Sequence, residues 1–158
     1  MRSESETNRA VEQYSDMIRR ICLCHLKNNE DVEDVFQAVF LKYLLYRGNF
    51  DSAEHEKAWF IRVAINACKD YRKSLFRRRT VSLEELAEEA ASVPPVRNEV
   101  LNAVLSLPAK YKDVIYLFYY EGYSAAEIGR LLHKKENTVY SLLSRGRIML
   151  KEALGGDL

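Results

Sequence analysis

Apolar side chains recur every three or four residues along most of this chain, a spacing that places them on one face of an α-helix. Three long stretches of this kind fill the first half. The first covers about residues 8–27, the second runs from Asp31, its expected cap, to about residue 47, and the third begins near Lys57. No stretch alternates apolar and polar residues as a half-buried strand would, so the pattern predicts an all-α fold.

The second half carries shorter helical stretches. One is stopped by Pro108, and the next is expected to run unbroken over residues 109–120. The apolar positions of these two helices, which the spacing predicts to be buried, are Val100, Leu101, Val104, Leu107, Tyr111, Val114, Ile115, Phe118 and Tyr119. Two amphipathic helices follow Gly122 and are joined by a tight basic turn over residues 133–135.

The last two predicted helices form a helix-turn-helix pattern. Ser124 is expected to cap the first of them, and Glu127 completes a capping box. In the second, one face is apolar, while the opposite face carries hydroxyls and a guanidinium, which suit base edges, beside lysines, which suit phosphates. The polar residues are Tyr140, Ser141, Ser144 and Arg145, with Lys134 and Lys135 at the helix entrance. This geometry alone fits ordinary packing as well as DNA binding.

Charge is distributed unevenly, although the formal net charge of the chain is only +1. Residues 50–80 hold eight Lys and Arg against four Asp and Glu, and residues 130–151 hold six against one. Between them, residues 81–99 hold five Glu and one Arg. Blocks this uneven favour two separate contacts with an anionic partner over a uniformly solvated surface. A helical bundle with fortuitous patches is the alternative.

Composition limits the other functions. The hydrophobic fraction of 47% suffices for packed cores, and the polar start of the chain predicts no signal segment, so we expect a cytoplasmic protein without membrane insertion. Cys22, Cys24 and Cys68 lack the pair spacing of a metal site, and the three histidines lie in unrelated segments. We therefore expect no metal, no cofactor, no small-molecule substrate and no enzymatic activity.

The acidic stretch divides the chain. It closes with Pro94 and Pro95, which disfavour a helix that runs through. The sequence predicts a first small helical domain over residues 8–79, a flexible acidic linker over residues 80–96 and a second small helical domain over residues 97–154. A short helical turn over residues 83–91 is compatible with the linker's composition.

Three segments in this order resemble bacterial sigma factors: residues 31–41 (DVEDVFQAVFL), residues 57–70 (KAWFIRVAINACKD) and the helix-turn-helix. The chain is similar to the small extracytoplasmic-function (ECF) class of the sigma-70 family, which keeps regions 2 and 4. This resemblance covers nearly the whole chain. It implies a protein that binds core RNA polymerase and directs promoter recognition, DNA melting and transcription initiation at a dedicated set of promoters. An anti-sigma factor is a common further partner in the family.

The resemblance also implies contact residues. The second helix would dock on polymerase through Asp34, Gln37, Phe40 and Leu41, with Ala38 where the family usually has Glu. The melted minus-ten element would meet Phe50, Arg62, Asn66, Lys69 and Lys73, while Trp59 is expected mainly to pack. The duplex minus-thirty-five element would meet Lys134, Lys135, Thr138, Tyr140, Ser141, Ser144 and Arg145.

Two other functions fit the residues without the resemblance. One is a stand-alone helix-turn-helix transcription regulator whose first block dimerises, and the other is a helical adaptor that binds only protein. Co-elution with core polymerase would separate the sigma factor from both of them. Salt-dependent DNA binding would separate the regulator from the adaptor.

Overall fold

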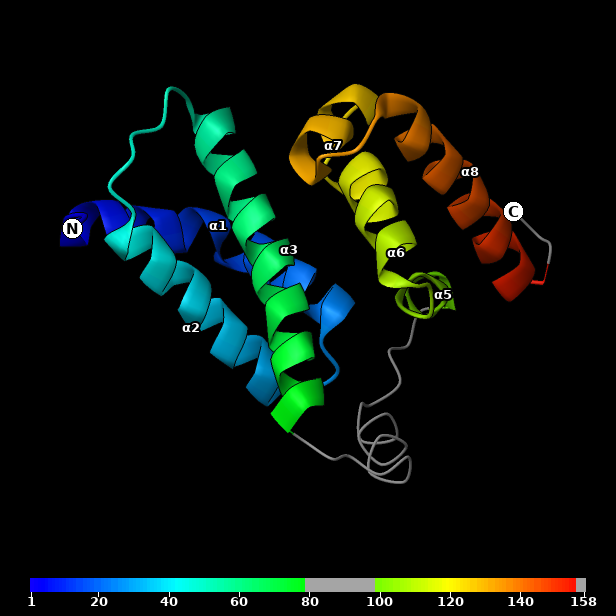
Figure 1. Cartoon of the computed structure of the whole chain (residues 1–158), viewed down its shortest axis with the longest axis horizontal. Coiled ribbons are helices and arrows are strands. Elements are labelled where there is room, and N and C mark those ends of the chain that lie inside the picture. The colour runs from blue at the N-terminus through cyan, green and yellow to red at the C-terminus, as the bar shows by residue number, and fades with distance from the viewer. Residues whose placement is uncertain (79–98, 156–158) are drawn as a thin grey trace. The chain divides into compact units, whose positions relative to one another are not determined.

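The computed structural model describes residues 1–78 and 99–155, and the side chains of residues 1–74 and 99–155. These residues form helices and no strand (Figure 1), as the periodicity predicted. They belong to two compact units, which divide between Val93 and Pro94. The predicted linker, with its expected turn over residues 83–91, lies outside the described residues.

The first unit consists of three helices that pack against one another: α1 (Glu4–His25), α2 (Asn29–Leu45) and α3 (Ala53–Arg78). Each helix contributes one apolar face to a common core. The buried core residues include Tyr14, Ile18, Ile21, Val35, Val39, Tyr43, Phe60, Ile61, Ala64 and Cys68.

All three helix starts of the first unit differ from the prediction because polar side chains cap the helices earlier than the apolar pattern begins. Ser3 caps α1, which begins at Glu4 and not near residue 8. Asn28, not Asp31, caps α2: its Oδ1 accepts a hydrogen bond from the Asp31 N–H at 2.8 Å. Asp31 lies in the first turn, where a carboxylate suits the positive end of the helix dipole. Helix α3 begins at Ala53, before Lys57, and the Ser52 hydroxyl accepts a hydrogen bond from the His55 N–H at 3.1 Å.

The second unit contains α5 (Glu99–Leu105), α6 (Ala109–Ile115), a π-helical segment (Tyr116–Tyr120), α7 (Ala125–Leu132) and α8 (Glu136–Ala153). Helix α8 packs against α5, α6 and α7 and so forms the centre of this unit. Its core includes Tyr111, Val114, Ile115, Leu117, Ile128, Leu131, Val139, Leu143 and Leu150.

The helix predicted over residues 109–120 changes its winding at Tyr116, where the π-helical segment begins. Its wider turn rotates the following side chains away from the positions that a period of 3.6 predicts. Leu117 is therefore fully buried, whereas Tyr119, predicted to be buried, is 58% exposed. Val100 and Leu101 of α5 were also predicted to be buried and are exposed.

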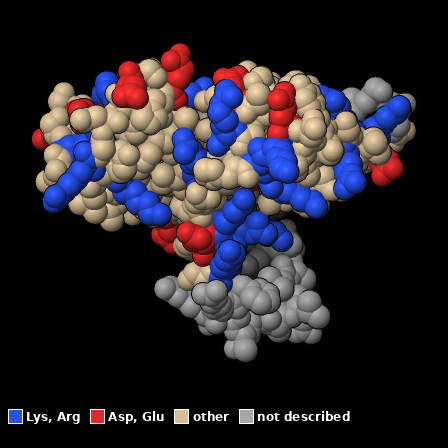
Figure 2. Space-filling model, turned by 45° about the horizontal axis from the view of Figure 1, so that its top comes forward, with Lys and Arg blue, Asp and Glu red and all other residues tan. Residues whose placement is uncertain are grey.

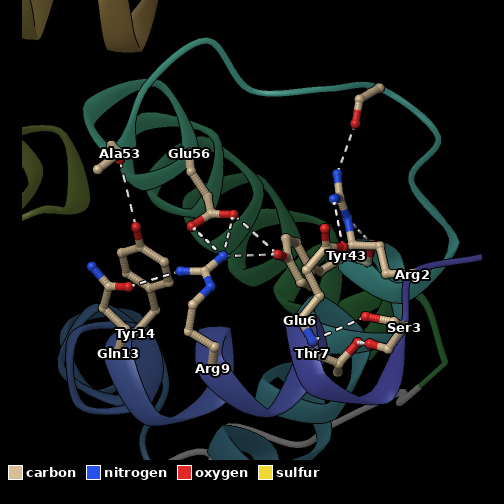
Figure 3. A network of polar contacts seen from close by, with 11 residues as sticks. Arg2, Ser3, Glu6, Thr7, Arg9, Gln13, Tyr14, Tyr43, Ala53 and Glu56 are labelled. Carbon is tan, nitrogen blue, oxygen red and sulfur yellow. Dashed lines mark hydrogen bonds and ion pairs between the residues drawn. The ribbon is translucent and has the colours of Figure 1, made fainter.

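One buried carboxylate links the three helices of the first unit (Figure 3). Glu56 of α3 accepts hydrogen bonds from Arg9 Nη2 of α1, at 3.0 Å to each carboxylate oxygen, and from the Tyr43 hydroxyl of α2 at 3.0 Å. Burial alone would raise the pKa of Glu56, but these donors outweigh it and hold the pKa below its ordinary value of 4.5. The ionised form of Glu56 therefore stabilises the folded unit.

This network predicts a loss of stability in acid. Because the pKa of Glu56 is lower in the folded than in the unfolded chain, its contribution is complete above the unfolded value of 4.5 and is lost as pH falls through the folded value. We expect the urea midpoint of the parent to decline as pH falls below about 5. Glu56→Gln should start lower and decline less over this range. Equal declines of the urea midpoint in the parent and in Glu56→Gln would show that Glu56 does not cause the loss of stability in acid.

Candidate nucleic-acid and polymerase interfaces

Local hydrogen bonds set the geometry of the helix-turn-helix. Ser124 caps α7 with the predicted capping box: its Oγ accepts from the Glu127 N–H at 3.2 Å, and Glu127 Oε1 accepts from the Ser124 N–H at 3.0 Å. His133 ends α7 in the left-handed conformation, with φ 55°. This residue turns the chain out of the helix, and α8 starts three residues later.

Gly129 allows the turn to lie close to α7. A Cβ at this position would lie 2.6 Å from the backbone oxygen of Lys134 and 3.6 Å from the Glu136 nitrogen. Lys134 lies in the short connection and Glu136 is the first residue of α8, so any larger residue at position 129 must displace the start of that helix. Gly129 therefore determines the placement of α8 relative to α7.

We predict that Gly129→Ala lowers the free energy of unfolding of the second unit by about 1–2 kcal/mol, because the clash outweighs alanine's better helix propensity. Urea denaturation followed by circular dichroism measures the change. Gly146→Ala is the matched control: its Cβ would meet side-chain atoms rather than backbone, namely Ile115 Cδ1 at 2.6 Å, Ile115 Cγ1 at 3.3 Å and Tyr111 Cβ at 3.7 Å, and the Ile115 side chain can rotate. Equal losses for the two variants would refute the role given to Gly129.

Helix α8 has one buried and one exposed face, as predicted. Val139, Leu143, Gly146 and Leu150 are buried, and so is Leu142. The seven residues expected to meet duplex DNA are all exposed and lie along α8 or at its N-terminal entrance: Lys134, Lys135, Thr138, Tyr140, Ser141, Ser144 and Arg145. The helix entrance also offers backbone N–H groups and the positive end of the dipole, which attract phosphate. This face can therefore bind an anionic, hydrogen-bonding partner.

A second polar face lies along α3. Arg62, Asn66, Lys69 and Lys73 are three or four residues apart and so share one side of the helix. The last three are exposed, whereas Arg62 is half-buried and its Nε has no hydrogen-bond partner among the described residues. Figure 2 shows Lys and Arg side chains over both units on the face presented.

Phe50, the fifth residue expected to meet the melted strand, lies in the loop between α2 and α3 within an aromatic cluster. Its ring is stacked on Tyr46 at 5.6 Å between centroids and meets the edge of Trp59 at 5.8 Å. Trp59 also contacts the rings of Tyr43 and Phe60, which agrees with the expectation that it packs. The cluster attaches this loop to the core of the first unit.

The four residues expected to meet polymerase do not share one environment. Asp34 and Gln37 are exposed, and Leu41 is 56% exposed, so these three lie on the outer face of α2. Phe40 instead is buried, and its ring packs against Phe60 at 5.5 Å between centroids. Phe40 therefore supports this face from behind.

The Tyr71 hydroxyl connects α3 to the start of α2. It lies 2.7 Å from Asp31 Oδ1 and 3.1 Å from Asp34 Oδ2, and burial together with these carboxylates raises the pKa of Tyr71.

We predict that Tyr71→Phe lowers the free energy of unfolding by about 0.5–1.5 kcal/mol. Urea denaturation measures it, with Tyr140→Phe, which removes an exposed hydroxyl, as the control. Equal midpoints for Tyr71→Phe and the parent would show that the contact contributes nothing.

The periodicity argument missed Arg2, Arg9 and Glu56. All three lie in polar stretches, and the contacts of Arg2 with Gly48 and of Arg9 with Glu56 join residues 46 and 47 positions apart along the chain. No local signal distinguishes such residues from ordinary surface charges. Among the described residues the three cysteines form no disulfide, and no group of three or more His, Cys, Asp or Glu could hold a metal ion. No helix in the described ranges is long and apolar enough to cross a membrane.

Comparison with known proteins places both units in one family. Residues 10–80 match the family model "Sigma-70 region 2", and residues 97–150 match "Sigma-70, region 4". The chain is 29% identical to the ECF RNA polymerase sigma factor SigW of Bacillus subtilis (strain 168), over 91% of this chain and 86% of SigW. It is 26% identical to SigM of Mycobacterium tuberculosis (strain H37Rv), over 90% of this chain and 74% of SigM.

A solved structure has the same fold. It is the sigma factor RpoE from Bartonella quintana, in complex with the anti-sigma factor NepR, with a TM-score of 0.70 at 18% identity over 97% of this chain and 99% of RpoE. Two family models that match both helical units, and relatives that match nearly the whole chain, agree with the helix-turn-helix and the two polar faces. The chain therefore belongs to the ECF class of the sigma-70 family and is an RNA polymerase sigma factor that directs promoter-dependent initiation of transcription.

Proposed function

We propose that the two units divide promoter recognition between them, at a dedicated set of promoters. The first, over residues 8–79, docks on core polymerase and reads the melted minus-ten element. The second, over residues 97–154, reads the duplex minus-thirty-five element, and the acidic segment over residues 80–96 links them. The observation that carries the proposal is α8: its polar, basic face is exposed along its whole length while its apolar face is buried.

The exposed face of α8 suits the major groove. An α-helix fits that groove, and Arg145 can hydrogen-bond to a guanine edge through two N–H groups. Ser141 and Ser144 lie beside it and can donate to or accept from bases. Lys134 and Lys135 lie at the helix entrance, where their charges can bind phosphates and set the depth and register of the helix.

The polar face of α3 suits a separated strand. An unpaired strand exposes both its phosphates and its base edges, and proteins bind such strands with basic grooves and aromatic platforms. Lys69 and Lys73 provide the charge, Asn66 can hydrogen-bond to a base, and Phe50 lies in the adjoining aromatic loop. Arg62 is half-buried on the same side of the helix, and its guanidinium can contribute positive charge toward the strand.

Polymerase binds the outer face of α2 in this proposal. We define the docking surface as Asp34, Gln37 and Leu41, with the buried Phe40 behind it. A largely exposed leucine beside polar side chains is typical of a protein interface, in which an apolar anchor is surrounded by hydrogen-bonding groups. Ala38 adds a small side chain at this surface where the family usually has a glutamate.

An anti-sigma factor is the second protein partner that we propose. The RpoE fold, shared by this chain, was solved with the anti-sigma factor NepR bound. A partner of this kind would keep the chain from polymerase until a signal releases it. The protein acts without a catalytic site of its own, and it acts in the cytoplasm, where polymerase and chromosome are found.

In vitro transcription tests the proposal directly. Purified core polymerase and this protein are incubated with a library of promoter sequences, and the transcripts are sequenced. We expect transcripts that depend on the protein and that share two upstream elements at fixed spacing. Binding of the protein to DNA without any effect on polymerase would instead support a stand-alone regulator.

A further inference from the structure

Arg2 lies before α1 and is attached to the far end of α2 and to the loop that follows it. Its backbone N–H donates to the Leu44 oxygen at 3.1 Å. Its side chain donates through Nε to the Tyr43 oxygen at 3.1 Å and through Nη2 to the Gly48 oxygen at 2.7 Å (Figure 3). The side chain is only 10% exposed. An arginine near the start of the chain is thus part of the structure around the loop.

The guanidinium of Arg2 also lies against the aromatic cluster. Its central carbon is 4.5 Å from the centroid of the Tyr43 ring, 5.0 Å from that of Phe50 and 5.9 Å from that of Tyr46. Arginine stacks on aromatic faces while its N–H groups donate in the plane, so it can make both kinds of contact at once. The Glu6 carboxylate, 3.1 Å from Nη1, holds the guanidinium from α1.

The loop segment over residues 47–50 has few other attachments. Among the described residues, the Gly48 oxygen is its only backbone group that hydrogen-bonds to another part of the unit. Gly48 itself lies under the Tyr46 ring, since a Cβ there would be 2.4 Å from the Tyr46 hydroxyl oxygen. The shape of this loop therefore depends on Arg2 and on the stacking of Tyr46 and Phe50.

We propose that Arg2 is a positioning residue for reading the melted minus-ten element: it holds residues 46–50 in the shape that presents Phe50 to the separated strand. The inference rests on the proposed function of this loop. A loop that is ordered before binding does not lose its conformational freedom on the DNA, so the sequence preference of the holoenzyme increases. Arg2 itself need not touch DNA.

In the opposite role, Arg2 would block a site at which a base stacks on the aromatic cluster. The guanidinium is planar and occupies the space among three rings, so a base could stack there only after Arg2 had left. The two hydrogen bonds to backbone oxygens and the low exposure of the side chain favour the positioning role. The two roles predict opposite effects of Arg2→Ala on the sequence preference of the holoenzyme. If Arg2 positions the loop, the preference weakens, and if Arg2 blocks the space between the rings, the preference becomes stronger.

The intrinsic fluorescence of Trp59 reports the loop without DNA. Trp59 is the only tryptophan of the chain, and its ring lies 5.1 Å from Tyr46 and 5.8 Å from Phe50 between centroids. Arg2→Ala should release the loop, shift the emission to longer wavelength and raise quenching by acrylamide by about half or more, since a loosened aromatic cluster admits solvent and quencher. Lys27→Ala, which removes an exposed charge of the same unit, is the control and should leave the emission unchanged.

The second measurement uses the holoenzyme. The parent holoenzyme selects a sequence from randomised single-stranded DNA, and its affinity for that oligonucleotide is compared with its affinity for a base-scrambled copy. Arg2→Ala should lower this ratio about 2- to 10-fold, the equivalent of one immobilised side chain or loop contact. Arg2→Lys keeps the charge but replaces the planar fork of three nitrogens, which reaches both carbonyl oxygens while lying against the rings, with a single ammonium, so it should lower the ratio as well. Lys27→Ala should weaken binding to both oligonucleotides equally.

The outcomes separate this inference from the proposed function. Unchanged Trp59 quenching in Arg2→Ala, or an increased DNA preference, would overturn the positioning role. An unchanged DNA preference in Arg2→Ala would also overturn it, if Phe50→Ala and Asn66→Ala lower that preference. Loss of polymerase binding by Arg2→Ala would overturn it too. If the parent shows no preference, or neither Phe50→Ala nor Asn66→Ala affects it, the proposed reading of the melted strand fails, and the inference fails with it. Increased quenching together with a lower preference in Arg2→Ala and Arg2→Lys supports the inference.

Discussion

Replacing Gln37 with Arg and Leu41 with Glu in the same chain is expected to weaken binding to core RNA polymerase by on the order of 100-fold, the equivalent of about 2–4 kcal/mol. The two residues are exposed and lie one turn apart on α2. In the docked state, the glutamate would carry a charge into the place of an apolar anchor, and the arginine would disturb its polar surroundings. A fluorescence titration of labelled protein with core polymerase measures the change.

The same substitutions should leave the fold intact, because neither side chain is part of the core. Circular dichroism and the urea midpoint are therefore expected to match the parent. Asn8→Arg with Leu23→Glu is the matched control, since it makes the same kinds of change at exposed positions of α1. If both double variants bind polymerase as the parent does, α2 is not the docking surface.

The helices of the first unit and the two faces of α8 could be predicted from the sequence because a helix turns each residue by a fixed angle. Once Val139 and Leu143 are placed on the buried face, Ser141 and Arg145 must lie on the other side, and the structure has them there. The same argument fails at Tyr116, where the winding changes to a π-helix and brings Leu117 into the core. The pattern alone contains no sign of that change.

The polar contacts of the first unit could not be predicted for a different reason. Arg9 is 47 positions from Glu56, and Arg2 is 46 positions from Gly48, so no local rule relates them. Glu56 precedes the predicted start of the third helix near Lys57, although it lies within the first turn of α3 and is buried. A charged residue in a polar stretch has the same appearance in sequence whether it is solvated or buried with its partners.

Phe40 shows the limit of carrying family positions over to this chain. The resemblance grouped it with Asp34, Gln37 and Leu41, but only these three share the exposed face of α2. Phe40 contacts the rings of Phe36 and Phe60 and fixes α2 against α3. Its substitution would therefore affect polymerase binding and stability together, whereas substitutions at Gln37 and Leu41 separate the two effects.

Substituting Arg145 and Lys135 separately distinguishes base reading from phosphate binding on α8. Arg145 is exposed one turn after Ser141 and makes no ion pair with another described residue, so its guanidinium is available to a base edge. Arg145→Ala is expected to cost about 1–3 kcal/mol at the preferred minus-thirty-five sequence and to relax the preference at one or two positions. Selection of promoters from a library by in vitro transcription measures both effects.

Lys135→Ala should have a different effect, because a residue at the helix entrance meets the sugar–phosphate backbone that every sequence shares. Binding should weaken by a similar factor on all promoters, and the dependence of log affinity on log salt should become shallower by about 0.9. The selected sequences should stay those of the parent. If Arg145→Ala also keeps the parent's minus-thirty-five preference and only weakens binding, then Arg145 binds phosphate as Lys135 does, and the bases are read by other side chains of the same face.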